Sequence, residues 1–103
     1  MAEYNKLVRD KIPQIIEAGG KTCTVRVLSE EEYLAKLDEK LGEELADYLE
    51  SKSMEELADL LEVIAATAAA RGCSWEQLQK IREDKHQKRG GFAQRLLLTQ
   101  VSE

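Results

Sequence analysis

Residues 29–70 read SEEEYLAKLDEKLGEELADYLESKSMEELADLLEVIAATAAA and predict two helices joined by a short break. Ser29 is followed three residues later by Glu32, and Ser53 is followed at the same distance by Glu56. This is the capping-box pattern of a helix N-terminus. Because only the polar stretch 51–53 separates the two patterns, we expect an antiparallel hairpin. The apolar residues that recur at the helical period of about 3.6 residues are Leu34, Leu37, Leu41, Leu45 and Tyr48, then Leu57, Leu60, Leu61, Ile64 and Ala68.

A further helix is predicted on each side of this hairpin. Ile12, Ile15 and Ile16 recur at helical spacing, and the glycines at positions 19 and 20 end that short segment. Ser74 is a helix cap in front of the stretch 75–88, which a second pair of glycines terminates.

One β-strand is predicted at Thr22–Leu28, because this stretch is rich in β-branched residues. The C-terminal stretch from Phe92 to Val101 contains three consecutive leucines, and we expect it to pair with the first strand. The predicted fold class is therefore mainly α, a helical bundle with a short two-stranded β element. At 103 residues the whole chain, 1–103, is expected to form a single domain.

Composition and charge favour a soluble cytoplasmic protein. The formal net charge of −5 argues against a nucleic-acid binder, which needs a basic surface to displace counterions. No apolar signal core is found at the N-terminus, and the longest apolar-rich run, Val63–Ala70, is too short to cross a bilayer. Cys23 and Cys73 fit neither a disulfide framework nor a zinc pattern, so we expect reduced, buried thiols.

Asp59 is an unexpected residue because its helix is apolar or small nearly all the way round. Between Leu57 and Ala70 the only other charge is Glu62. A buried carboxylate is expensive unless a cation or strong hydrogen-bond donors meet it, so we expect Asp59 to have such a partner. The alternative for each acidic residue is a plain solvated position on the helix surface.

Four carboxylates are expected to converge across the hairpin. Glu56 and Asp59 are three residues apart on the second helix, and Glu44 and Asp47 repeat this spacing on the first, with Glu43 beside them. Carboxylates held close together must gather counter-charge or protonate. An all-oxygen set selects a hard ion, so we predict a Mg²⁺ site, with Mn²⁺ as the alternative metal. Glu56 is the least secure ligand, because the Ser53 capping box competes for its side chain.

The acidic motifs resemble a known family. The run 43–47, EELAD, followed by ELAD at 56–59, is similar to the EExxE…ExxD signature of the MazG-like, all-α nucleoside triphosphate pyrophosphohydrolases. The opening YNKLVRDKIP at 4–13 and the closing RGGF at 89–92 resemble a subgroup of small phosphoribosyl-ATP-pyrophosphohydrolase-like proteins. The chain departs from the family pattern by having Asp47 where the family has Glu, and by a shorter spacing between the two motifs.

The resemblance implies Mg²⁺-dependent hydrolysis of a nucleotide between its α- and β-phosphates, giving a monophosphate and pyrophosphate. One role of such a hydrolase is the removal of non-standard nucleotides. The catalytic residues would be Glu44 and Glu43, the latter orienting the attacking water or supporting a metal ligand. Metal ligands would be Glu44, Asp47, Glu56 and Asp59, and the cations for substrate phosphates would be Lys6, Arg9, Lys85 and Arg89.

Two other functions stay open on the sequence. A nucleotide- or metal-binding regulatory module with a degenerate site would explain Asp47 and the short spacing, and a purely structural helical protein would explain acids lying on the surface. We also expect a homodimer or higher homo-oligomer. A helix that is apolar on several sides needs more cover than three short helices supply, and members of the resembled family associate.

Overall fold

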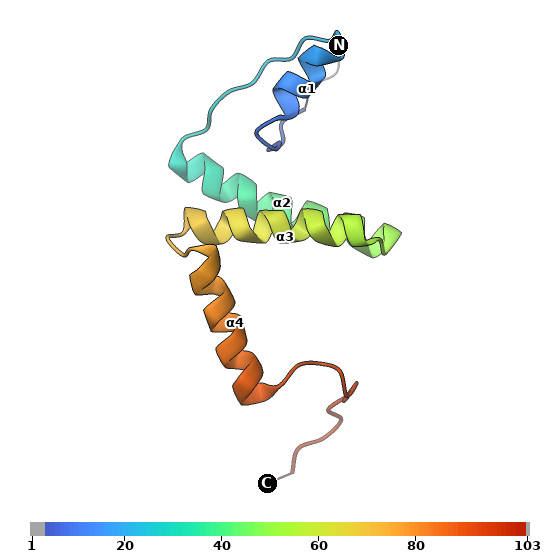
Figure 1. Ribbon diagram of the computed structural model, residues 1–103. Helices are drawn as coiled ribbons and strands as arrows, with labels where there is room; N and C mark the ends of the chain where they lie inside the picture. Colours follow the sequence, from blue (N-terminus) through green and yellow to red (C-terminus); the bar gives the residue numbers. More distant parts are fainter. Residues whose placement is uncertain (1–3, 103) are drawn as a thin grey trace.

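The computed structural model describes residues 4–102 of the chain and contains four α-helices in that range. Figure 1 shows α2 and α3 lying side by side, with α1 on one side of them and α4 projecting away on the other. The prediction of a mainly helical fold is confirmed. The helices are α1 (Ile12–Ala18), α2 (Glu30–Ser51), α3 (Met54–Ala70) and α4 (Trp75–Arg89).

Side-chain caps begin the three long helices at the predicted residues. The Ser29 hydroxyl accepts the backbone N–H of Glu32 at 3.2 Å, and the Glu32 carboxylate accepts the N–H of Ser29 at 3.2 Å. Ser74 and Gln77 form the same reciprocal pair at the start of α4. Between α2 and α3, Lys52 adopts the left-handed conformation with φ of 58°, which reverses the chain in a very short turn and produces the hairpin.

The predicted two-stranded β element is wrong for the described residues. Between 4 and 102 no segment is a strand: Thr22–Leu28 is an extended connection from α1 to α2, and the chain beyond Arg89 forms neither helix nor strand. Val27 is 95% exposed and Leu97 is 86% exposed, so these apolar side chains do not pack on the helices. A strand needs a partner for its backbone groups. Here the two candidates lie at opposite sides of the hairpin (Figure 1), because α4 carries the second one away.

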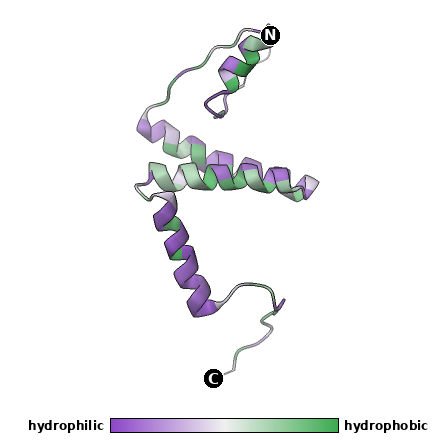
Figure 2. Cartoon of the chain, in the orientation of Figure 1, coloured by the Kyte–Doolittle hydropathy of each residue, from purple (hydrophilic) through white to green (hydrophobic). Residues whose placement is uncertain are grey.

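The chain is elongated and buries little apolar surface. Its radius of gyration is 18.2 Å, whereas a compact domain of this length is expected to have roughly 13 Å. Leu37, on α2, is the single fully buried apolar side chain among the described residues. Figure 2 shows the same imbalance, since α3 is hydrophobic along most of its length while α4 is almost entirely hydrophilic.

Both cysteines are free thiols, as expected. Cys23 is exposed and Cys73 is partly exposed, so the expected burial is wrong for Cys23. Among residues 4–102, none of the helices combines the length and the apolar character that a bilayer crossing demands.

Candidate metal centre

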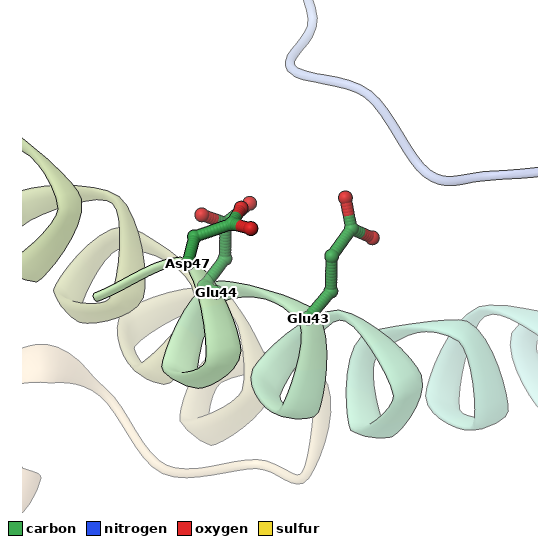
Figure 3. A group of neighbouring side chains, drawn as sticks. All are labelled: Glu43, Glu44 and Asp47. Carbon is green, nitrogen blue, oxygen red and sulfur yellow. The ribbon is translucent and has the colours of Figure 1, made fainter. Parts of the chain in front are cut away.

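The α2–α3 hairpin brings all four predicted metal ligands together. Glu44, Glu56 and Asp59 offer carboxylate oxygens that lie within 4.8 Å of one another, and Glu43, Glu44 and Asp47 do the same. Glu44 belongs to both triads and therefore links them into one acidic cluster, which we define as these five residues. Figure 3 shows Glu43, Glu44 and Asp47 leaving α2 on the same side.

Glu44 is the buried member of the cluster, and Asp59 is not. The Glu44 side chain is 11% exposed, whereas the Asp59 side chain is 44% exposed. The expectation that Asp59 is buried by its apolar helix is wrong, because that side of α3 faces the thin N-terminal segment rather than another helix. Glu44 is therefore the carboxylate of the cluster that most needs a cation or hydrogen-bond donor beside it.

The N-terminal segment supplies two of the predicted cations. The Lys6 ammonium lies 3.0 Å from Glu43 Oε1, and Arg9 Nη2 donates to Asp59 Oδ1 at 2.7 Å. The hydrogen bond and charge of Glu43 raise the pKa of Lys6, so this lysine is firmly protonated at neutral pH. We expected Asp59 to have a cation or a hydrogen-bond donor as its partner, and Arg9 is that partner.

The other two predicted cations lie elsewhere. Lys85 and Arg89 are exposed residues near the end of α4, which projects away from the hairpin (Figure 1). Within residues 4–102, no ion pair joins either residue to the acidic cluster. A single chain therefore does not assemble all four predicted phosphate-binding cations around the carboxylates.

Lys40 is a member of the site that the sequence reasoning missed. Its ammonium lies 3.3 Å from Glu43 Oε1 and 3.4 Å from Glu44 Oε1, and its side chain is only 17% exposed. The signal was present in the sequence, since Lys40 precedes the two glutamates by three and four residues, the spacing of neighbours on a helix. The hydrogen bond from Lys6 and, after it, that from Lys40 hold the pKa of Glu43 below its usual value and keep this carboxylate ionised.

Glu56 is free to join the cluster, because the predicted competition with helix capping does not occur. Its backbone N–H donates to the Ser53 hydroxyl at 3.2 Å, but the backbone N–H of Ser53 donates to Ser51 Oγ instead of the Glu56 carboxylate. Desolvation raises the pKa of Glu56, and the negative charges of Asp47, Asp59 and Glu44 raise it further. The Glu56 carboxylate therefore lies in an excess of negative charge.

The acidic cluster carries more negative charge than its neighbouring cations offset. The five carboxylates of the cluster meet three cations, Lys6, Arg9 and Lys40, and five minus three leaves two negative charges. All candidate ligand atoms are carboxylate oxygens, which suit a hard ion such as Mg²⁺ or Mn²⁺. The donor set therefore fits the predicted metal in both chemistry and charge.

A cleft of about 510 Å³ adjoins the cluster, which is within the size range of small-ligand sites. Glu44 and Asp59 form part of its wall together with Arg9, Lys40 and Tyr33. The remaining walls come mainly from apolar residues of the N-terminal segment and of the hairpin, with two further carboxylates, those of Asp10 and Glu62. The cleft thus combines acidic groups, two cations and an apolar and aromatic surface.

The chain is therefore a helical protein with a candidate centre for a hard divalent cation. This centre is the acidic cluster on the α2–α3 hairpin, beside the cleft. A protein of Mycolicibacterium smegmatis (strain ATCC 700084 / mc(2)155), described as uncharacterized, is 55% identical to the chain over 42 residues. These residues make up 41% of this chain and 43% of that protein, so the chain matches less than half of the relative's length. No protein-family model and no solved structure matches the chain. The function is therefore inferred from the cluster and its cleft.

Proposed function

We propose that the chain is a Mg²⁺-dependent hydrolase that converts a nucleoside triphosphate or related nucleotide to the monophosphate and pyrophosphate. The observation that carries this proposal is the pair of carboxylate triads that share the buried Glu44. The MazG-like motifs at 43–47 and 56–59 coincide with these triads, and the resemblance to that family supports the choice of reaction. We include a cytoplasmic location in the proposal.

In this site Glu44, Asp47, Glu56 and Asp59 would hold the metal. A bound Mg²⁺ would polarise a phosphate oxygen and lower the pKa of a water molecule. Glu43 is fixed in place by Lys6 and Lys40, and its ionised carboxylate accepts hydrogen bonds, so it suits the orientation of the attacking water.

The cations around the cluster suit a phosphate chain. Arg9 and Lys40 line the cleft, where they would meet the negative charge that develops on the phosphates during the reaction. Tyr33 lines the same cleft, and its ring offers an apolar face for a base or a sugar. Substrate would thus be held between the N-terminal segment and the hairpin.

A direct test is the release of pyrophosphate from a panel of standard and modified nucleoside triphosphates, phosphoribosyl-ATP and other nucleotide derivatives, with Mg²⁺ present. We expect equal amounts of pyrophosphate and monophosphate, and a loss of at least about 100-fold in Glu44→Gln, because ligand carboxylates are central to metal catalysis. Glu50→Gln is the matched control, since Glu50 is an exposed residue of α2 outside the cluster.

Each alternative gives its own result. Release of inorganic phosphate instead of pyrophosphate would contradict the proposed bond, and turnover unchanged by Glu44→Gln would contradict the proposed site. Metal binding that depends on Glu44, without turnover of any nucleotide in the panel, would indicate the regulatory binding module instead. The shorter side chain of Asp47 is the feature of this chain that favours that second function.

A further inference from the structure

We propose that Lys40 is a positioning residue that makes metal binding at the acidic cluster depend on the nucleotide. Its ammonium pairs with Glu43 and Glu44, and it would leave these carboxylates for the phosphates when a nucleotide binds. The inference rests on the proposed function and adds to it how metal and nucleotide affect each other's binding. Lys40 lies outside the two acidic motifs, at 43–47 and 56–59.

Lys40 is the least exposed of the three cations at the cluster. Its side chain is 17% exposed, whereas the side chains of Lys6 and Arg9 are 50% and 57% exposed. The interaction between two charges becomes stronger as water is excluded from their surroundings. Lys40 is therefore the cation whose charge should act most strongly on the carboxylates and on any ion that they bind.

The Lys40 ammonium lies beside a carboxylate that both triads share. It is 3.4 Å from Glu44 Oε1, and Glu44 belongs to both triads. It is also 3.3 Å from Glu43 Oε1. A metal ion held by Glu44 would share this carboxylate with a second positive charge, and like charges repel. Lys40 should therefore weaken metal binding for as long as its ammonium stays on the carboxylates.

The same side chain also borders the place where the phosphates would bind. Lys40 forms part of the wall of the larger cleft, together with Arg9. A lysine carries a compact charge on a flexible stem, so its ammonium can change partners without a movement of the helix. Phosphate oxygens in the cleft would be strong acceptors for it. Its transfer would relieve the repulsion of the metal, so metal and nucleotide should each tighten the binding of the other by the same factor.

A purely structural role for Lys40 predicts a different result. Lys40 precedes Glu43 and Glu44 by three and four residues, and such ion pairs stabilise a helix whether or not a metal binds. If that were its whole role, removing the charge would loosen the two carboxylates and would leave metal binding unchanged or weaker. If Lys40 opposes the metal, removing the charge strengthens metal binding. The sign of the change therefore separates the two roles.

The first test is the Mn²⁺ affinity of protein stripped of metal, measured without nucleotide from the electron paramagnetic resonance of free Mn²⁺. Lys40→Met should bind Mn²⁺ at least about tenfold more tightly than the wild type, the effect of removing one charge a few ångströms from a divalent ion even at the dielectric of water. Lys40→Arg retains the charge and should keep the weaker affinity. Lys80→Met is the matched control, because it removes the same charge from an exposed ion pair with Asp84 on α4.

The second test measures how Mg²⁺ changes the affinity for a nucleotide. The probe is a nucleoside triphosphate analogue with a methylene group between the α- and β-phosphorus atoms, titrated by calorimetry in a chelator and in saturating Mg²⁺. Mg²⁺ should tighten the binding of the analogue by a larger factor in the wild type than in Lys40→Met, because only the wild type has an ammonium to transfer. Lys40→Gln takes the place of Lys40→Met if circular dichroism shows that the latter does not fold.

Two results would overturn the role of Lys40 alone. One is a folded Lys40→Met or Lys40→Gln protein that binds Mn²⁺ no more tightly than the wild type, and the other is an equal effect of Mg²⁺ on the analogue in both proteins. Mn²⁺ binding that is lost in Glu44→Gln would then leave the metal centre standing. A wild type that binds no Mn²⁺, with or without a nucleotide, would overturn both proposals. None of these measurements requires turnover, so a lack of hydrolysis would contradict the proposed reaction only.

Discussion

Replacing Glu44 by Gln should stabilise the metal-free protein while removing its response to metal. Glu44 offers oxygens within 4.8 Å of the carboxylates of the four other cluster residues, and two of these, Asp47 and Glu56, have no ion pair among the described residues. The Lys40 ammonium lies 3.4 Å from Glu44. Even when both are taken at the upper limit of 4.8 Å, the two repulsions from these unpaired carboxylates outweigh the one attraction at 3.4 Å. For an effective dielectric between roughly 80 and 20, the net relief is about 0.5–2 kcal/mol. Lys40 keeps Glu43 as its partner in the variant.

The assay is thermal unfolding at a fixed protein concentration, with a chelator or with Mg²⁺. In a chelator the melting temperature of Glu44→Gln should rise by about 4–8 °C for each kcal/mol of relief. In Mg²⁺ the wild type should gain about 2.7 kcal/mol at a concentration 100 times the dissociation constant, and the variant should gain almost nothing. Glu50→Gln should behave as the wild type. A Glu44→Gln protein that is less stable in chelator and still responds to Mg²⁺ would show that Glu44 is neither repelled by its neighbours nor a metal ligand.

Three further predictions concern residues around the hairpin. Leu37→Ala should lower the free energy of unfolding by about 2–5 kcal/mol in urea titrations, because Leu37 is fully buried, and a loss below 1 kcal/mol would show that the site is not a core position. Arg26 and, after it, the hydrogen bonds with Ser29 lower the pKa of Glu32 to about 2 from its ordinary value of 4.5, so the stabilisation is present above pH 4.5 and is lost as the pH falls toward 2. In Arg26→Ala, NMR titration should show that pKa rising toward 4.5, and an unchanged value would exclude the ion pair as its cause. Arg9→Ala should raise the Mg²⁺ affinity of the nucleotide-free protein by up to about fivefold, since it frees Asp59 from an exposed ion pair, and should slow nucleotide turnover. Calorimetric titration showing weaker Mg²⁺ binding would assign Arg9 a structural role instead.

The helices were predictable from the sequence because their signals are local. Ser29 with Glu32 and the cap at Ser74 are contained within four residues, and each begins a helix where the pattern places it. The strand at 22–28 was not predictable, because a strand forms only when a second segment lies beside it. In this chain the second segment follows a helix that points away from the hairpin (Figure 1).

The sequence predicted which carboxylates form the candidate site. It did not predict which of them is buried or which cations pair with them. The spacing of the two acidic pairs placed four carboxylates on facing helices, and the structure brings them together. Which carboxylate is buried depends on how the N-terminal segment lies across the hairpin, and no pattern in the helices encodes that. Glu44 therefore replaces Asp59 as the most buried ligand, and Lys40 enters the site beside it.

Whether the acidic cluster binds a metal ion can be measured by following Mn²⁺ with electron paramagnetic resonance in protein stripped of metal. We expect that the wild type removes free Mn²⁺ from solution in a saturable way, that Mg²⁺ competes, and that folded Glu44→Gln has lost this binding. Binding is to be measured with and without a nucleotide. An undiminished signal of free Mn²⁺ in both conditions, or equal binding by Glu44→Gln, would contradict the assignment of the acidic cluster as a metal centre.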